Sequence, residues 1–437
     1  MPAADTVVLP DRGRLFTGYA FDQQSCVIAA VSGGGDSLAL LLLLKDFLKT
    51  LPDAPRLLAV TVNHALRPEA AGEADYVARL CGTCGIDHRV VTWRGEKPAT
   101  GISAAARSAR LSLLATVARE TGAGLVFTGH TRDDQAETVA MRAERGTGRG
   151  SAGIAPATLH EGQIWFARPL LRTGRAELRA FLTARDLRWI DDPSNDDRSY
   201  ERVRTRQAMT PELTAALVEQ ARAAARERVA LGEQAARLID RHSSCVAPGL
   251  YRVSQAVFEN GDDAALLYAL RVLAAMVGGA EQLPSADRLV AVPEQLRKGI
   301  CATLSRAVMV PRAGAVYFHR ERRNLPSIPG AGHPFLWDGR YRLSADAGVV
   351  IAPFGTCGRD WLPAPVPSLP QTLLFSAQFA EPALWREGVC LGPARNHADG
   401  ARVSVPAPWA RLLPSFDIAL ANALKRLIGD KTVLALP

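Results

Sequence analysis

Short apolar runs alternate with longer runs of helical pattern through the first part of the chain. The apolar runs, typical of strands buried on both faces of a sheet, lie at 27–31, 56–62, 88–93 and 125–128. The helical runs between them lie at 38–44, 69–80 and 103–120. Strands that alternate with helices at this spacing predict an α/β fold built on a doubly wound parallel sheet.

The elements that follow are shorter. Residues 164–167 are predicted to form an edge strand of this sheet. Thr173 is expected to cap the next helix, and Ser103 the helix at 103–120, because a hydroxyl group accepts hydrogen bonds from the first free N–H groups of a helix.

The pattern changes at Thr210, where Thr-Pro-Glu is a strong helix start. A long alanine-rich helix is predicted from there to about residue 240, with a second helix at 263–277 and a short strand pair within 312–325. Beyond residue 328 proline and glycine are frequent, and a last helix is predicted at 417–428. Because 437 residues are many for one core, we predict an α/β domain at 1–209, a mainly helical domain at 210–328 and a small β-containing domain at 329–437.

A glycine-rich loop follows the first predicted strand directly. It consists of Ser32, Gly33, Gly34, Gly35, Asp36 and Ser37. Between a strand and a helix, such a loop points free N–H groups at an anion, and glycine lets a phosphate approach the backbone. The loop lacks the Gly-Lys-Ser/Thr of a Walker A motif, and Asp36 stands where the lysine would be. A carboxylate beside a phosphate implies a cation between them, so Mg²⁺ is predicted at Asp36.

Two short segments that each contain a histidine also follow predicted strands. They are Asn63, His64, Gly129 and His130. Ligands of doubly wound sheets bind beyond the carboxyl ends of the strands, so these residues should share a site with the loop. Arg107 and Arg110, three apart on a predicted helix, are spaced to hold phosphate oxygens, although solvated surface arginines are the alternative.

Acidic residues mark the helix predicted to open after residue 130. Asp133 and Glu137 are four apart and so share one helix face, which suits a metal ion or a positively charged substrate. The alternative, strongest for Asp134, is that these acids stabilise the helix dipole.

Composition adds three constraints. The net charge of +8 is carried almost wholly by arginine and is compatible with a polyanionic partner such as a nucleic acid. No apolar run approaches the length of a membrane span and no signal peptide is evident, so a cytoplasmic protein is expected. The seven cysteines are scattered and do not suggest a disulfide framework. Cys81 and Cys84 form a C-x-x-C pair that is interpreted as structural, since the next cysteine is Cys245.

The order of the motifs resembles that of bacterial tRNA(Ile)-lysidine synthetases, which belong to the N-type (PP-loop) ATP pyrophosphatases. The matching motifs, within residues 25–206, are Ser32–Ser37, Asn63-His64, Ala106-Arg107 with Arg110, Gly129–Thr138, Arg145–Gly148, Arg168–Leu171 and Trp189–Asn195. Two positions depart from the family pattern: Leu111 replaces an aromatic residue, and Val203 interrupts Arg-Asn-Arg.

This resemblance implies that ATP adenylates the C2 oxygen of the wobble cytidine of the CAU-anticodon tRNA(Ile). Free L-lysine then displaces AMP, which forms lysidine and changes decoding from AUG to AUA. ATP is the implied co-substrate and Mg²⁺ the implied metal, and a homodimer is one expected assembly.

The implied functional residues fall into four groups. The catalytic residues are Asp36, Asp133 and Glu137. The ATP-binding residues are Ser32–Ser37, Asn63, His64, Arg107, Gly129 and His130. The tRNA or substrate residues are Arg110, Arg145, Asp191, Asp192, Arg202 and Arg204. The candidates for holding lysine are Asp191, Asp192, Asp133 and Glu137.

Two alternatives stay open at this point. A tRNA thiolase would use the same ATP chemistry with Cys81 and Cys84, and a degenerate protein would bind nucleotide without catalysis. The intact loop with Asp36, Asp133 and Glu137 argues against the second.

Overall fold

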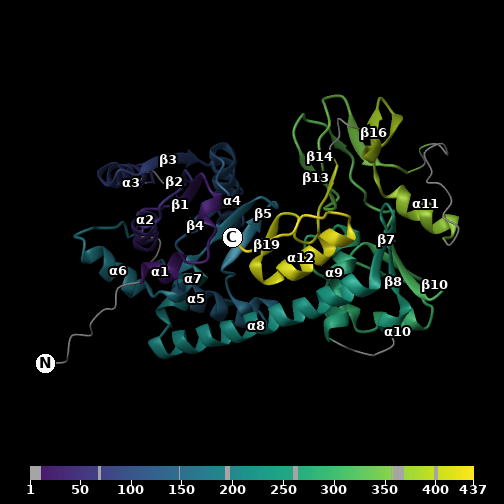
Figure 1. Ribbon diagram of the computed structural model, residues 1–437, viewed down its shortest axis with the longest axis horizontal. Coiled ribbons are helices and arrows are strands. Elements are labelled where there is room, and N and C mark those ends of the chain that lie inside the picture. Colours follow the sequence, from purple (N-terminus) through teal and green to yellow (C-terminus); the bar gives the residue numbers. More distant parts are fainter. Residues whose placement is uncertain are drawn as a thin grey trace. The chain divides into compact units, whose positions relative to one another are not determined.

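The structure, a computed structural model, describes residues 11–66, 70–146, 148–191, 197–258, 264–355, 357, 369–397 and 402–437 (Figure 1). Contacts within the chain divide it into two compact units. The first consists of Met1–Arg228, Leu412–Phe416 and Ala435–Pro437, and the second of Val229–Arg411 and Asp417–Leu434. The three domains at 1–209, 210–328 and 329–437 stay a prediction. No helix in the described ranges is long and apolar enough to cross a membrane.

A seven-stranded sheet lies at the centre of the first unit, in the order β19-β5-β6-β4-β1-β2-β3. Its strands are β1 (Cys26–Ala30), β2 (Arg56–Asn63), β3 (Asp87–Thr92), β4 (Leu125–Thr128), β5 (Ala157–His160), β6 (Ile164–Ala167) and β19 (Leu412–Pro414). The neighbours from β3 to β6 are all parallel, which confirms the predicted sheet.

Two antiparallel strands extend this sheet, so the prediction that residues 164–167 form an edge strand is wrong. Strand β5 pairs antiparallel with β6. Strand β19 then pairs antiparallel with β5, with Leu413 opposite Leu159. Because β19 comes from near the end of the chain, the local apolar pattern around residue 164 carries no sign of it.

Helices cover both faces of the sheet, as a doubly wound fold requires. On one face lie α1 (Arg12–Phe16), α2 (Gly35–Leu48), α3 (Ala70–Cys84) and α6 (Arg175–Thr183), and on the other lies α4 (Ile102–Thr121). The side chains of β1 alternate between two cores: Val27 and Ala29 pack in the first, Ile28 and Ala30 in the second. This burial on both faces explains why β1 is apolar at every position.

The predicted helix caps differ from the observed ones. Helix α4 has Gly101 as its N-cap and α6 has Gly174, so the predicted caps Ser103 and Thr173 are wrong. In α6 the missing capping side chain is replaced by Glu177, which accepts a hydrogen bond from the Gly174 N–H at 3.0 Å. Residue 69, the predicted start of the helix now seen as α3, lies outside the described residues.

The second unit contains more strands than the sequence indicated. Helix α8 (Pro211–His242) runs into it from the first unit, and α9 (Ala264–Gly278) and α10 (Val292–Arg297) follow. Between and after these helices, five strands form a sheet: β7 (Ser243–Ala247), β8 (Leu250–Ser254), β11 (Ala315–Arg320), β10 (Ala307–Arg312) and β9 (Ala302–Leu304). The strand pair predicted within 312–325 is the β10–β11 hairpin, shifted toward the N-terminus.

Short strands and two helices complete the second unit. A four-stranded sheet joins β12 (Ile328–Pro329), β15 (Val350–Pro353), β16 (Pro382–Arg386) and β17 (Val389–Pro393). A three-stranded sheet joins β13 (Phe335–Trp337), β14 (Tyr341–Leu343) and β18 (Val403–Ser404). The helices are α11 (Gln371–Phe379) and α12 (Ile418–Leu427), the second close to the prediction at 417–428.

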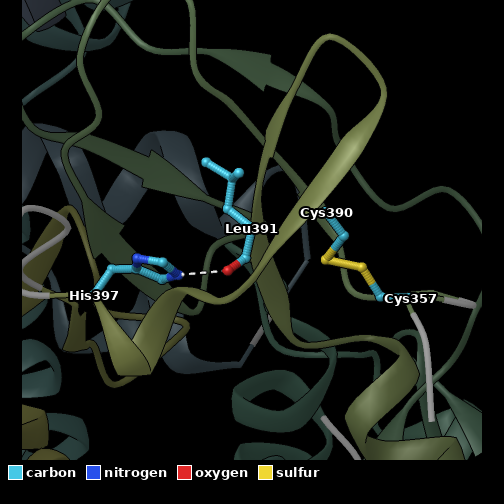
Figure 2. The surroundings of a disulfide bond; sticks show 4 residues. All are labelled: Cys357, Cys390, Leu391 and His397. Atoms are coloured by element: carbon cyan, nitrogen blue, oxygen red, sulfur yellow. Dashed lines mark hydrogen bonds between the residues drawn. A yellow bond between two sulfur atoms is a disulfide. The ribbon is translucent and has the colours of Figure 1, made fainter. Parts of the chain in front are cut away.

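Cys357 and Cys390 form a disulfide in the second unit (Figure 2). Beside it, the carbonyl group of Leu391 contacts the Nε2 atom of His397 at 3.0 Å. The remaining cysteines are free, as expected for a chain without a disulfide framework. Sequence spacing could not reveal this pair, because a disulfide depends on the distance between two residues in space.

Candidate active site

The glycine loop is held in shape by its own side chains. The Ser37 hydroxyl accepts a hydrogen bond from the Ser32 N–H at 3.1 Å and donates one to the Gly34 carbonyl at 2.9 Å. Gly33 has a φ of 87°, where other residues are strained, and a Cβ atom there would lie 2.9 Å from Cδ1 of Ile190. The loop is therefore preformed at the start of α2, where free helical N–H groups can receive an anion.

Two other segments close around the loop. At the end of β4, a Cβ atom on Gly129 would lie 3.0 Å from the carbonyl oxygen of Asp36, so only glycine allows this approach. On the other side, the Ile190 N–H donates to the Gly33 carbonyl at 3.0 Å. The predicted motifs at residues 32–37 and 129–138 thus meet residues 189–191, the part of the third motif that the structure describes.

A cavity of about 370 Å³ opens at this loop. Its lining residues are Ser32, Gly34, Gly35, Asp36, Ser37, Arg110, Gly129, His130, Asp134, Arg175, Arg179, Ile190, Asp191, Arg202 and Arg206. Most of the predicted loop and strand-end residues are among them.

Asn63 ends β2 and His64 follows it, but neither lines this cavity. The Oδ1 atom of Asn63 accepts a hydrogen bond from the Ala65 N–H at 2.8 Å and so fixes the turn. The Nδ1 atom of His64 is buried, with no hydrogen-bond partner in the described part of the chain. Burial, together with the charge of Arg110, lowers the pKa of His64, so its ring is neutral at physiological pH.

His130 lies inside the cavity and is also neutral. Its Nδ1 atom contacts the Thr128 hydroxyl at 3.0 Å. Burial and then the charge of Arg168 hold the pKa of His130 well below its usual value of 6.5. The imidazole is therefore a hydrogen-bonding group here, and it adds no positive charge to the arginines around it.

Arg175, from the first turn of α6, reaches across the cavity to three carboxylates. Its Nε atom lies 3.2 Å from Asp36, its Nη2 atom 3.1 Å from Asp134 and its Nη1 atom 3.4 Å from Glu137. Its backbone N–H donates to Asp133 at 2.8 Å. One residue thus connects the glycine loop, α5 (Arg132–Ala143) and α6.

The carboxyl group of Asp36 has a pKa that its burial raises. Burial raises the pKa of Asp36 to about 6, and the positive charge of Arg175 limits the rise. The carboxylate is ionised at neutral pH but is poorly solvated, so a cation beside it would be stabilising.

Glu137 is the most enclosed of these acids, with an exposed fraction of 1%. It accepts hydrogen bonds from Arg202 Nε and Arg206 Nε, each at 2.8 Å, besides Arg175. Both new partners come from α7 (Glu201–Gln207). A buried carboxylate is stable only with such partners, so Glu137 fastens α7 to α5.

Asp134 has two roles. Its side chain accepts a hydrogen bond from the Thr131 N–H at 2.7 Å, which completes a capping box at the start of α5. It also accepts from Arg202 Nη2 at 2.8 Å. The interpretation of Asp134 as a helix-start acid is therefore correct in part, and the same carboxylate faces the cavity.

A second cavity, of about 650 Å³, shares Arg175 and Arg206 with the first and has Glu137 in its own wall. Asp133 and Glu219 add carboxylates to its wall, and the first turns of α8 close it. The guanidinium groups of Arg175 and Arg206 therefore lie between an anion-binding loop and a space of mixed charge.

The other predicted substrate residues are dispersed. Arg145 is exposed and forms an ion pair with Glu201. Arg204 donates to the carbonyl groups of residues 198 and 199, each at 2.8 Å. Asp191 accepts a hydrogen bond from the Trp189 indole at 3.2 Å. Asp192 lies outside the described residues.

Arg175 and Arg206 were not predicted from the sequence. For Arg175 there was one signal: an arginine at the first position of a helix opposes the helix dipole and needs acidic partners. Arg206 continues the arginine-rich run that contains Arg202 and Arg204, but the sequence does not show which of these face α5.

Comparison with known proteins agrees with this geometry. Residues 12–213 match the family model of the PP-loop domain. The first unit also has a glycine loop between strand β1 of the sheet and helix α2. Together with the match, this loop places the first unit in the PP-loop class of ATP-using proteins.

Similarity over the whole chain is more specific. A tRNA(Ile)-lysidine synthase of Mesorhizobium japonicum is 43% identical over 97% of this chain and 96% of its own length. Those of Rhizobium meliloti and Brucella anthropi are each 36% identical, over 92% and 95% of this chain and 91% and 96% of their own lengths. The chain belongs to the tRNA(Ile)-lysidine synthase family.

Solved structures are more distant. The U34-tRNA thiolase NcsA from Methanococcus maripaludis has 18% identity and a TM-score of 0.41, over 48% of this chain and 77% of that one. An NAD+ synthetase from Burkholderia pseudomallei has 12% identity and a TM-score of 0.28, over 47% and 82%. These values are too low to add to the argument.

Proposed function

We propose that this protein joins lysine to the wobble cytidine of the CAU-anticodon tRNA(Ile) at the expense of ATP, in the cytoplasm. The observation that carries the proposal is the adjacency of the two cavities, one at an anion-binding loop and the other with Asp133 and Glu137 in its wall. The names of the relatives, tRNA(Ile)-lysidine synthases, support it.

In the first cavity, the glycine loop would hold the phosphates of ATP. The free N–H groups at the start of α2 and Arg110 meet the negative charge of the phosphates. Asp36 fits a Mg²⁺ ion, because its poorly solvated carboxylate faces the loop, and Mg²⁺ commonly binds one or two carboxylates together with substrate phosphates. When bound, the ion would neutralise charge on the departing pyrophosphate.

The reaction would proceed in two displacements. The C2 oxygen of cytidine attacks the α-phosphorus of ATP, and the bond to the β-phosphate breaks to release pyrophosphate. The ε-amine of lysine then attacks C2, the amine loses a proton, and the original C2 oxygen leaves as part of AMP. The protein's contribution is mainly positioning and stabilisation of moving negative charge by Arg110 and the loop.

Lysine would occupy the second cavity. Its ammonium groups would meet Asp133 and Glu137, and its carboxylate would meet one of the lining arginines, such as Arg132 or Arg172. The shared wall brings this space beside the loop, as attack on an adenylated base requires.

Replacing Asp133 with asparagine tests this placement. The amide still accepts a hydrogen bond from the Arg175 N–H but loses its charge. We expect the KM for lysine to rise about tenfold, which corresponds to about 1.4 kcal/mol, while lysine-independent pyrophosphate release is nearly unchanged. Steady-state kinetics with varied lysine measure this, with Glu227→Gln as the matched control, since Glu227 is an exposed acid of α8 that does not line the cavity. An unchanged KM would place lysine elsewhere.

The thiolase alternative needs a reactive cysteine, and Cys81 of the pair at Cys81 and Cys84 lacks that character. Cys81 is fully buried in the core, and burial raises its pKa to about 11, so it stays protonated. We expect Cys81→Ser/Cys84→Ser to keep most of its activity and the purified protein to be colourless. An inactive but folded double variant would favour thiolation.

The product identifies the reaction directly. Unmodified tRNA(Ile) incubated with ATP and lysine should gain the mass of lysine less one water, as measured by mass spectrometry of the digested RNA. A gain of sulfur, or no gain while ATP is consumed, would contradict the proposed function.

A further inference from the structure

A third cavity, of about 250 Å³, lies in the first unit apart from the two already described. Four arginines line it: Arg107 from α4, Arg142 from α5, Arg168 after β6 and Arg228 from α8. Phe416, which follows β19, forms part of an apolar wall. Every residue of its lining is described, and none is an aspartate or a glutamate.

Three of these arginines, Arg107, Arg142 and Arg168, have either neutral partners or none among the described residues. Arg168 is 8% exposed and donates to the Ala155 carbonyl at 2.9 Å, yet its buried Nε atom has no hydrogen-bond partner in the described chain. Arg142 donates to the Gly153 carbonyl at 2.8 Å. Arg107 makes no hydrogen bond or ion pair with any described residue. For these three arginines, N–H donors therefore outnumber the acceptors that the described residues offer.

The positive charges also repel one another. Burial and the charge of Arg107 lower the pKa of Arg168 to about 10, and the same two causes lower that of Arg142. Burial lowers the pKa of Arg107 as well. All three still carry a full charge at neutral pH, so the cavity attracts anions and their binding would relieve the repulsion.

We propose that this cavity binds a phosphate group, and that in the complex this is a backbone phosphate of the tRNA beside the wobble cytidine. The proposal rests on the proposed function for the identity of the RNA. Arg107 and Arg110 are one turn apart on α4, and they line the third and the first cavity respectively. Thr138, in the third cavity, directly follows Glu137. An RNA chain with one base at the glycine loop would thus have its neighbouring phosphate within reach of these arginines.

The apolar wall supports a nucleotide more than a bare ion. The guanidinium of Arg228 lies 5.1 Å from the centre of the Phe416 ring, so a flat cation and a ring lie together at the edge of the cavity. In nucleic-acid complexes, aromatic rings and guanidinium planes stack on the bases of a nucleotide, while other arginines bind its phosphate.

The salt dependence of tRNA binding tests the proposal. Each phosphate neutralised contributes roughly 0.7–0.9 to the slope of log K against log salt concentration. We expect Arg107→Ala and Arg228→Ala each to lower that slope by about one unit, measured with unmodified tRNA(Ile) and no ATP. Arg226→Ala is the matched control, since Arg226 is exposed on the same helix as Arg228 and does not line the cavity.

A second measurement distinguishes a phosphate of the tRNA backbone from a free phosphate ion. Calorimetric titration with inorganic pyrophosphate, while a non-hydrolysable ATP analogue occupies the glycine loop, reports a free anion in the third cavity. Loss of this binding in both variants with an unchanged tRNA slope would assign the site to a free phosphate. If both variants match Arg226→Ala in slope and in pyrophosphate binding, and melt at the temperature of the unmodified protein, the proposal is overturned. These are binding measurements, so failure to form lysidine would not affect them.

Discussion

Replacing Asp36 with alanine is expected to lower the rate of tRNA-dependent pyrophosphate release by about 10²–10³-fold, the usual effect of removing a group that stabilises the transition state electrostatically. Asp36 supplies the carboxylate of the glycine loop itself, and its only ion pair within the described chain is with Arg175. Without it, the proposed Mg²⁺ would lose its protein ligand beside the phosphates. The binding of tRNA should be nearly unchanged, because no role in holding RNA is assigned to Asp36.

The Asp36 variant should also stay folded. The folded state raises the pKa of Asp36 to about 6, above its ordinary value of 3.8, so the unfolded state favours the ionised form more strongly. The charged group therefore reduces stability above pH 6, and its contribution becomes more favourable as the pH falls toward 4. Asp46→Ala on the same helix, which removes an ion pair with Arg185 outside the cavity, is the control. Normal pyrophosphate release by Asp36→Ala would mean that the metal role is wrong.

The fold of the first unit could be read from the sequence wherever neighbouring residues determine it. Strand β1 is apolar because both of its faces are buried, and the glycine loop follows from its position before α2. Strand β19 could not be predicted, because its partner β5 is far away in the chain. The predicted N-caps of α4 and α6 were wrong because glycine is also an acceptable N-cap residue. In α6, Glu177 accepts the hydrogen bond from the N–H group of the glycine cap.

The candidate site was predictable at the ends of β1 and β4, but not at the end of β2, where Asn63 and His64 do not line the cavity, and not across helices. His130 and Gly129 line the cavity because β4 ends there, as the topology requires. The place of Arg175 in the site depends on how the start of α6 lies against α5. The helical pattern of a sequence gives no information about the distance between two helices. The same limit applies to Arg202: it stays a predicted tRNA or substrate residue, and the sequence could not show that it contacts Asp134.

Replacing Glu137 with glutamine should have the largest effect on stability. The amide keeps the shape but removes the negative charge from a side chain that is 1% exposed and contacts Arg175, Arg202 and Arg206. Breaking a buried ion pair by removing one partner costs about 3–5 kcal/mol. We expect the free energy of unfolding to fall by that amount, as measured by chemical denaturation. Glu144→Gln, at the exposed end of the same helix, should change it by less than about 0.5 kcal/mol.

A double-mutant cycle with Arg206→Gln then separates structure from catalysis. If Glu137 serves mainly to neutralise Arg206, the double variant should be less destabilised than the sum of the two single variants, by an interaction energy of about 0.5–3 kcal/mol. Stability would then be partly restored, but lysidine formation should stay low, because the carboxylate proposed to meet the lysine ammonium is still missing. Recovery of activity together with stability would show that Glu137 acts only by holding α7 against α5, and lysine would have to bind through other acids.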